Sequence, residues 1–203
     1  MLIGAVADDI TGATDLCLMI SREGMRTVQV IGLPDKGKPL PEADAVVIAL
    51  KSRAIPASAA VSMSLEAAQA LRRAGARQVL FKYCSTFDST DEGNIGPVAE
   101  ALLQDAGSDL TIACPSFPAT GRTTYKGHLF VGDQLLSDSP MRDHPLNPMR
   151  DSNLQRVLQR QTALPVGLVD IATIRRGVAA VERAFAEHRS AGKRILIVDA
   201  LDD

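Results

Sequence analysis

The segment that decides the fold is Leu2-Ile3-Gly4-Ala5-Val6-Ala7-Asp8-Asp9-Ile10-Thr11-Gly12. Its first six residues are uncharged and mostly apolar, which is typical of a buried β-strand, and two carboxylates follow directly. The next residues, 12–22, have the apolar spacing of a helix. A buried strand that leads through a short polar turn into a helix is the opening of a parallel strand-helix-strand unit.

The rest of the chain repeats this alternation of strand and helix. The predicted strands are residues 2–7, 27–32, 45–50, 78–83, 110–114, 166–170 and 194–199. The predicted helices are residues 12–22, 57–74, 95–106, 152–161 and 173–191. Because the strands are nearly continuous apolar runs, we predict an α/β, Rossmann-like fold, with a mainly parallel sheet and helices on both faces.

Two segments interrupt the alternation. Residues 36–41 combine Lys, Gly and Pro, and we expect an exposed loop there. Residues 115–149 are rich in Pro, Gly and polar side chains. Within them, residues 128–131 and 134–136 flank Gly132-Asp133, a pattern that predicts a β-hairpin insertion.

Composition and charge exclude several classes of protein. The chain has 203 residues, of which 46% are hydrophobic, with a net charge of -2 and three widely spaced cysteines. We therefore expect no disordered chain, no disulfide framework, and no nucleic-acid or membrane-surface partner. The longest apolar run, residues 45–50, is far shorter than the roughly 18 residues that span a bilayer. A reducing, cytoplasmic location is the simplest expectation.

The first candidate site follows the first predicted strand. Asp8 and Asp9 lie where a parallel sheet binds ligands, beside the start of a helix. Asp9 or Thr11 could cap that helix, which would explain one carboxylate and leave the other. Arg53 follows the third predicted strand, so the same rule places it near this site, where its guanidinium could donate hydrogen bonds to a carboxylate. The alternative is that Arg53 is an exposed loop cation.

The second candidate site is Lys82-Tyr83-Cys84-Ser85, which follows the fourth predicted strand. A lysine within an apolar strand is costly unless its charge is paired or used. Hydroxyl groups in residues 85–90 could bind an oxygen-rich ligand, or they could belong to surface turns before a helix capped by Asn94. No histidine stands at a diagnostic spacing from Cys84, so we interpret that thiol as structural.

A third candidate groups Arg122, Lys126 and His128, which could contact an anion or phosphate. The segment is not a Walker A loop, and no GxGxxG is present, so a dinucleotide site is disfavoured. The three histidines form no metal-binding pattern, and we expect no metal ligated by the protein. Residues 143–154 are interpreted as a rigid connector in which Asp151 or Ser152 caps the next helix.

Five ordered motifs together resemble the N-terminal domain of the four-carbon acid sugar kinase family. They are Ala7-Asp8-Asp9-Ile10-Thr11-Gly12-Ala13; Lys82-Tyr83-Cys84-Ser85-Thr86-Phe87-Asp88-Ser89-Thr90; Cys114-Pro115-Ser116-Phe117-Pro118; Gly121-Arg122-Thr123 with Gly127-His128-Leu129-Phe130-Val131; and His144-Pro145-Leu146-Asn147-Pro148-Met149 with Asp151-Ser152-Asn153-Leu154. The resemblance runs from residue 7 to the end of the chain.

This resemblance implies an activity, cofactors and site residues. It implies ATP-dependent phosphorylation of the terminal hydroxyl of a four-carbon sugar acid, with Mg²⁺ as companion ion. Residues 1–203 would form the sugar-acid-binding domain, and a C-terminal domain of the same polypeptide, absent here, would carry most of the nucleotide site. The substrate contacts implied by position are Asp8, Asp9, Arg53, Lys82, Tyr83, Cys84 and Ser85. Family members that act on threonate or erythronate tend to have an acidic residue where Cys84 stands, which favours the branch that acts on 3-oxo-tetronate.

Within this scheme we interpret Asp9, or failing that Asp8, as the group that orients or deprotonates the attacking hydroxyl. Two other classes stay open. A magnesium-dependent phosphohydrolase would use Asp8 and Asp9 as metal ligands and nucleophile, and a non-catalytic module would bind a sugar acid without turnover. Apolar surface at the missing domain's docking face could also give a homo-oligomer.

Overall fold

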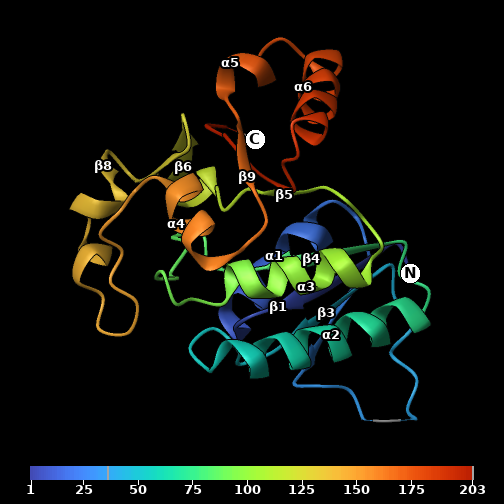
Figure 1. Ribbon diagram of the computed structural model, residues 1–203. Coiled ribbons are helices and arrows are strands. Elements are labelled where there is room, and N and C mark those ends of the chain that lie inside the picture. Colours follow the sequence, from blue (N-terminus) through green and yellow to red (C-terminus); the bar gives the residue numbers. More distant parts are fainter. Residues whose placement is uncertain (36, 203) are drawn as a thin grey trace. The chain divides into compact units, whose positions relative to one another are not determined.

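A computed structural model describes residues 1–35 and 37–202 (Figure 1). The chain divides into two compact units, Met1–Cys84 and Ser85–Asp203. Lys36, in the predicted loop 36–41, lies outside the described residues, and residues 37–41 form neither helix nor strand, as predicted. No helix among the described residues is long and apolar enough to cross a membrane.

The first unit contains a four-stranded parallel sheet in the order β2-β3-β1-β4. The strands are β1 (Ile3–Ala7), β2 (Thr27–Ile31), β3 (Ala45–Ala49) and β4 (Gln78–Lys82), and the helices are α1 (Ile10–Arg22) and α2 (Ala57–Arg73). Strand β3 is completely buried, because it lies between β2 and β1 and is covered on both sides. The carboxyl ends of the four strands meet at one edge of the sheet, as the sequence predicts.

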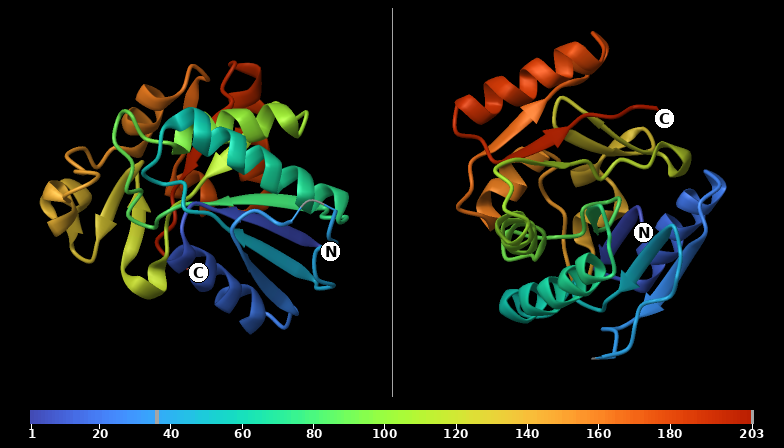
Figure 2. Two further views of the ribbon diagram at one scale, coloured as in Figure 1. Left: turned by 90° about the horizontal axis from the view of Figure 1, so that it is seen from below. Right: turned by 90° about the vertical axis from the view of Figure 1, so that its right-hand side faces the viewer.

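Small side chains let the two helices approach this sheet on opposite faces (Figure 2). Ala5 and Ala7 point to the face that α1 covers, where they pack with Ala13 of that helix. Gly4 points to the other face, where a Cβ would lie only 3.0 Å from Cβ of Leu71 in α2. The alternation of side chains along β1 therefore sets one face for each helix.

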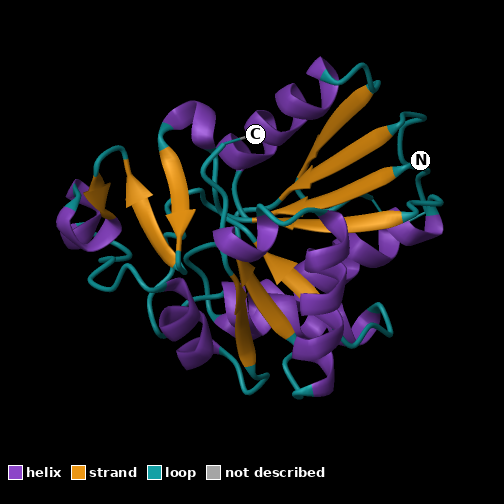
Figure 3. Ribbon diagram, turned by 90° about the horizontal axis from the view of Figure 1, so that it is seen from above, coloured by secondary structure: helices purple, strands orange, loops and turns teal. Residues whose placement is uncertain are grey.

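The second unit contains a three-stranded parallel sheet in the order β5-β10-β9, whose strands are drawn in orange with the others in Figure 3. The strands are β5 (Thr111–Ala113), β9 (Val166–Val169) and β10 (Ile195–Val198). The helices are α3 (Ile95–Asp105), α4 (Leu154–Gln161), α5 (Ile171–Ile174) and α6 (Val178–Ser190). Side chains of α4 bond the edge strand directly: Gln159 accepts from the Val166 N–H, and Gln155 donates to the Val166 carbonyl.

An antiparallel sheet of β6 (Arg122–Tyr125), β7 (His128–Val131) and β8 (Gln134–Leu135) also belongs to the second unit. The predicted hairpin at Gly132-Asp133 is confirmed by β7 and β8. Strand β6 was not predicted, and it pairs with β7 through a turn at Lys126-Gly127. Short 3₁₀ turns complete this part of the chain, at Pro118–Thr120, Leu136–Asp138 and Pro140–Asp143.

Every predicted strand is present and the α/β class is confirmed, but the arrangement differs in two respects. The seven predicted strands form two parallel sheets and not one. The predicted helix 173–191 is two helices, α5 and α6, separated at Gly177, whose φ of 86° lies in the left-handed region. That backbone angle ends the first helix and redirects the chain.

Candidate functional site

Asp8 and Arg53 form a paired centre at the carboxyl edge of the first sheet. Asp8 follows β1, and its backbone N–H donates to the Lys82 carbonyl on the neighbouring strand. Its two carboxylate oxygens accept from two guanidinium nitrogens of Arg53, over 3.0 Å from Nε and 2.7 Å from Nη2. This bidentate geometry is the strongest arrangement for such a pair. The sequence expectation that Arg53 approaches the first strand end is confirmed, and the reading as an exposed loop cation is wrong.

Burial gives this pair its electrostatic character. The Asp8 side chain is 6% exposed and that of Arg53 is 19% exposed. Burial raises the pKa of Asp8 above its ordinary value, and the hydrogen bond and charge of Arg53 offset part of that rise. Burial also opposes the charge of Arg53, but its bonds with Asp8 outweigh that cost and raise the pKa of the guanidinium. Each charge therefore depends on the other.

Asp9 caps a helix with one carboxylate oxygen and leaves the other oxygen accessible. Its Oδ1 accepts from the Gly12 N–H over 2.8 Å and so caps α1, which confirms the capping interpretation for this acid. The same Oδ1 lies 2.9 Å from Nη2 of Arg53. Among the described residues, no group bonds the second oxygen, Oδ2, and the side chain is 29% exposed. One carboxylate oxygen of Asp9 can therefore accept a hydrogen bond from a ligand.

Lys82 brings a second cation to the same strand ends. It ends β4 and is half-buried, and its Nζ donates to the Tyr83 carbonyl over 2.6 Å. A Cβ at Gly12 would lie 3.1 Å from this Nζ and 2.7 Å from Oδ1 of Asp9. Glycine at position 12 therefore leaves room for the ammonium group beside the first turn of α1, where free N–H groups already favour an anion.

The remaining residues of the second predicted site are divided between the units. The Tyr83 ring packs against Phe81, with ring centroids 5.5 Å apart. Cys84 is half-buried and forms no disulfide. Ser85 is the first residue of the second unit and lies in a half-buried turn, so the geometry of the first unit does not include it.

The loop that follows Ser85 is buried and tightly held. Phe87 and Asp88 have φ angles of 62° and 48°, which is costly backbone for residues other than glycine. The Asp88 carboxylate accepts from the Asn147 amide over 3.0 Å, and Gln161 donates to the Ser89 hydroxyl over 2.9 Å. Ser89 is 4% exposed, so the reading of this segment as surface turns is wrong.

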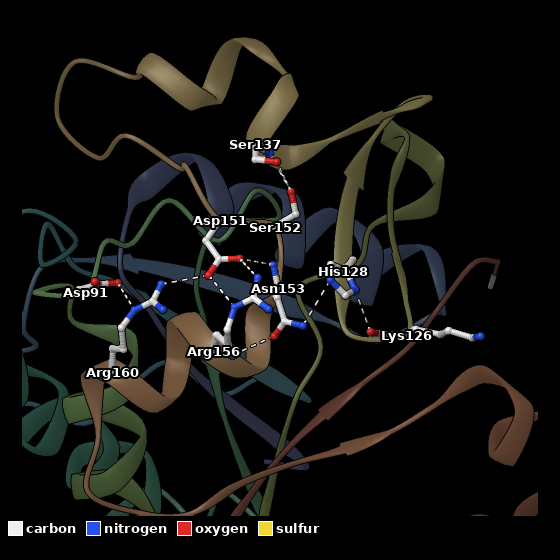
Figure 4. A network of polar contacts seen from close by, with 9 residues as sticks. All are labelled: Asp91, Lys126, His128, Ser137, Asp151, Ser152, Asn153, Arg156 and Arg160. Carbon is white, nitrogen blue, oxygen red and sulfur yellow. Dashed lines mark hydrogen bonds and ion pairs between the residues drawn. The ribbon is translucent and has the colours of Figure 1, made fainter.

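Two further predictions about helix caps concern this region. Asn94 occupies the N-cap position of α3, but its side chain makes no capping bond. Helix α4 is capped by Asn153, whose Oδ1 accepts from the Arg156 N–H, and not by Asp151 or Ser152 (Figure 4). The Ser152 hydroxyl is instead engaged with Ser137.

Arg122, Lys126 and His128 do not converge in the structure. Arg122 begins β6, whereas Lys126 and His128 lie at the turn that follows the other end of that strand. Both ring nitrogens of His128 have partners, the Lys126 carbonyl at 2.9 Å and the Asn153 amide at 3.3 Å (Figure 4). The Lys126 ammonium lies over the Tyr125 ring, 5.6 Å from its centroid. An anion that touched all three side chains would have to span the length of the strand.

Asp199 is a buried anchor that no motif in the sequence indicates. It follows β10 and is 1% exposed. Its carboxylate accepts from three backbone N–H groups, of Lys126, Gly127 and Ile171, over 2.6, 2.8 and 2.9 Å. The only signal in the sequence is its place after an apolar strand, which it shares with Asp8.

Asp91, Asp151 and Arg160 line a cavity of about 340 Å³ in the second unit. They belong to a charged network, shown in Figure 4, that no sequence pattern predicted. Arg160 bonds both Asp91 and Asp151, over 2.7 and 3.1 Å, and Arg156 bonds Asp151 over 2.7 Å. The hydrogen bond from Arg156 is the main cause that lowers the pKa of Asp151 to about 2. Within residues 1–35 and 37–202, no three His, Cys, Asp or Glu side chains are grouped to hold a metal ion.

The chain has an α/β fold, and the carboxyl ends of the strands in its first unit bring together Asp8, Arg53 and Lys82. Such a site suits a small, polar, anionic ligand. The chain belongs to the family of sugar-binding N-terminal domains, which it matches over residues 3–203. It is 60% identical over 202 residues to a Burkholderia multivorans protein named 3-oxo-tetronate kinase, covering 100% of this chain and 47% of that protein. A Haemophilus influenzae protein of the same name is 46% identical over 202 residues, covering 100% of this chain and 49% of that protein. The family resemblance drawn from the five motifs is confirmed.

Solved structures agree with the fold. A crystal structure of a Haemophilus influenzae protein matches with a TM-score of 0.95 and 46% identity, covering 98% of this chain and 48% of that chain. A domain of unknown function from Bordetella bronchiseptica, a domain-swapped dimer with bound citrate, matches with a TM-score of 0.77 and 26% identity, covering 100% of this chain and 48% of that chain. The chain thus spans about half the length of the curated relatives that it matches.

Proposed function

We propose that this chain supplies the sugar-acid site of an ATP-dependent kinase that converts 3-oxo-tetronate to its 4-phosphate. The name shared by relatives at 46% to 60% identity supports the substrate class and the reaction. The match to sugar-binding N-terminal domains supports the assignment of the sugar acid to this half of the longer polypeptide. The nucleotide site would then belong mainly to the other half.

The observation that carries the proposal is the charge cluster at the strand ends of the first unit. Asp8, Asp9, Arg53 and Lys82 lie together there, although they come from three different strand ends. Two carboxylates beside two cations suit a ligand that has both hydroxyl groups and a carboxylate. We assign the ligand's carboxylate to Lys82 and the first turn of α1, with Arg53 beside them.

Asp9 is the residue that we assign to the attacking hydroxyl. Its Oδ2 has no partner among the described residues, whereas both oxygens of Asp8 are bonded by Arg53. Asp8 therefore acts by holding the guanidinium in place, and Asp9 by orienting the hydroxyl or accepting its proton. Tyr83, Cys84 and Ser85 follow Lys82 directly in the chain, and we keep them as proposed contacts of the substrate.

ATP would supply the phosphoryl group, and Mg²⁺ would neutralise charge on it as the group is transferred. Such transfer relies on positioning and electrostatics more than on covalent chemistry of the protein. Because this chain matches only about half of each curated relative, we assign both cofactors mainly to the other half of such a polypeptide. The task of this chain is to hold the sugar acid with its terminal hydroxyl oriented.

A phosphohydrolase that uses Asp8 and Asp9 as magnesium ligands is less well supported. A metal ion would have to compete with Arg53, which already occupies both oxygens of Asp8 and approaches Asp9. A binding module without turnover has the same geometry as the kinase half, and it differs only in the activity of the full-length polypeptide.

Thermal unfolding of this chain with added ligands tests the proposal. We expect 3-oxo-tetronate at about 100 times its Kd to stabilise the chain by about 2.7 kcal/mol, which corresponds to a rise in Tm of roughly 5 to 10 °C. ATP with Mg²⁺ should give little change, and the chain alone should release no phosphate from the 4-phosphate product. Strong stabilisation by ATP alone would contradict the split site, and phosphate release would favour the phosphohydrolase.

Turnover by the full-length polypeptide tests the assignment of Asp9. Asp9→Asn keeps an oxygen that can cap α1 and removes the negative charge, so the fold should persist while kcat falls about 100-fold or more. Asp15→Asn is the matched control, because Asp15 is exposed on the same helix and should leave kcat unchanged. An unchanged kcat for Asp9→Asn at saturating substrate would remove Asp9 from the mechanism.

A further inference from the structure

Strand β2 has an open edge. It is the outermost strand of the four-stranded sheet as described, with β3 on its inner side only. The Gly32 N–H donates to the Ala49 carbonyl, and the Arg26 carbonyl accepts from the Ala45 N–H, so even-numbered residues direct their backbone groups toward β3. Because the direction alternates along a parallel ladder, the backbone N–H and C=O groups of Thr27, Gln29 and Ile31 point away from the sheet.

This edge lacks the features by which proteins usually protect an open strand. Its sequence, Thr-Val-Gln-Val-Ile, contains no charge, no proline and no glycine, and its residue types favour strands. The Ile31 side chain is 71% exposed. An uncharged, β-favouring edge with outward-pointing backbone groups is a surface to which another strand can be added.

We propose that β2 pairs antiparallel with β2 of a second copy of this chain, about a two-fold axis at Gln29. In this register Thr27 lies opposite Ile31 of the second copy, and Gln29 lies opposite itself. The residues that face each other are then those with outward backbone groups, so each pair exchanges N–H···O bonds. The flanking Arg26 lies opposite Gly32, so no like charges meet. The strand is complementary to itself.

The same register covers the exposed apolar side chains on the face of α1. The Thr14 hydroxyl bonds the Gln29 side chain over 3.1 Å, so this side of α1 lies over β2. Leu18, one helical turn further and 50% exposed, extends toward Thr27, because α1 runs antiparallel to the strands that it connects. Ile31 of the second copy lies opposite Thr27 and on this face. Each Leu18 therefore gains an Ile31 as its neighbour.

The mass of the chain in solution tests this interface. We expect a dimer, twice 21.6 kDa, at about 50 µM by sedimentation equilibrium. Ile31→Lys places a charge on the edge and should give a monomer with an unchanged circular dichroism spectrum. Leu146→Lys is the matched control, because Leu146 is also 71% exposed but belongs to the other unit, and this variant should stay dimeric. A monomeric wild type, or a dimer that survives Ile31→Lys, would overturn the proposal; the second result would point to a swapped dimer like that of the Bordetella bronchiseptica domain.

Disulfide trapping tests the register. In a background of Cys114→Ser, which removes the exposed thiol, Gln29→Cys should form a disulfide across the axis, because the facing Cα atoms would be about 5.5 Å apart. Thr27→Cys is the control, since it faces Ile31 and lies roughly 13 Å along the strand from its own equivalent. Efficient trapping by Thr27→Cys and not by Gln29→Cys would refute this register.

Discussion

Removal of Arg53 is the perturbation that best separates a paired, buried site from an ordinary surface ion pair. Arg53→Met keeps much of the side-chain volume and leaves the Asp8 carboxylate, 6% exposed, without its guanidinium partner. Loss of one partner of a buried pair costs about 3 to 5 kcal/mol. Because Arg53 is 19% exposed, water can reach the space that its side chain leaves. We therefore expect the free energy of unfolding, measured in urea at neutral pH, to fall by about 3 kcal/mol, the lower end of this range.

The loss of stability in Arg53→Met should depend on pH, and the burial of Asp8 determines the direction of that dependence. Burial already raises the pKa of Asp8 above the unfolded value of 3.8, and removal of Arg53 raises it further. A folded state that binds a proton more tightly than the unfolded state loses stability as pH rises through the folded-state pKa. The destabilisation caused by Arg53→Met should therefore be smaller near the unfolded-state pKa of 3.8 than at about pH 7.5.

Two further variants complete this experiment. Addition of Asp8→Asn to Arg53→Met removes the unpaired charge and should recover part of the lost stability. Lys38→Met is the control, because Lys38 and Asp35 also lie 2.7 Å apart but are 75% and 71% exposed, so this loss should stay below about 0.5 kcal/mol. A loss from Arg53→Met no larger than the control, or one independent of pH, would refute the reasoning about this pair.

Three further predictions concern the second unit. Asp199→Ala leaves three backbone N–H groups without their acceptor and should lower the free energy of unfolding in urea by about 4 kcal/mol. The control Asp202→Ala, at an exposed site, should change it by less than about 0.5 kcal/mol. Equal effects of the two variants would contradict the anchoring function of Asp199. Gly96→Ala puts a Cβ 2.5 Å from Cβ of Gln161 and should lower Tm. A higher Tm, as expected for Gly→Ala at an open helical site, would show that α3 and α4 do not make this contact. Because the pKa of Asp151 lies at about 2, its carboxylate stabilises the fold above pH 3.8, and this stabilisation is lost as the pH falls toward 2. We expect the loss to be roughly 1 kcal/mol, since the Asp151–Arg156 pair is partly exposed. Asp151→Asn should abolish this part of the acid dependence in a pH series of unfolding curves.

Local sequence patterns were sufficient to predict the parallel strands, β7, β8 and most helices. Each of these strands is a short, mostly apolar run next to polar turn residues, and such a pattern indicates burial. The pattern carries no information about which strand becomes a neighbour, so it could not show that β5, β9 and β10 form their own sheet. Strand β6 escaped because Arg-Thr-Thr-Tyr has no apolar alternation, and its pairing with β7 alone defines it.

The predicted helix boundaries are wrong where side-chain hydrogen bonds to other residues compete with capping. Ser152 and Asp151 are good capping residues in isolation, but their side chains bond Ser137 and Arg156, which leaves Asn153 as the cap. The break between α5 and α6 depends on the left-handed backbone at Gly177, and a single glycine within an apolar helical pattern is a weak signal.

The candidate site was predictable as a location and not as a set of bonds. The rule for parallel sheets correctly placed Arg53 with Asp8 and Asp9. It could not show that the guanidinium engages both carboxylates, because that depends on the path of residues 50–53, where the Ser52 N–H bonds the Asp8 carbonyl. The grouping of Arg122 with Lys126 rested on closeness in sequence, and an extended strand separates them.

We propose that this chain binds a four-carbon sugar acid through the charged strand ends of its first unit. Calorimetric titration of 3-oxo-tetronate into the wild-type chain, Asp9→Asn and Asp15→Asn measures this binding. We predict one binding site, a Kd that Asp9→Asn weakens about 10-fold to 100-fold through loss of a charged hydrogen bond, and no change from Asp15→Asn. Absence of binding to the wild type, or equal affinity in all three proteins, would exclude this site as the place where the sugar acid binds.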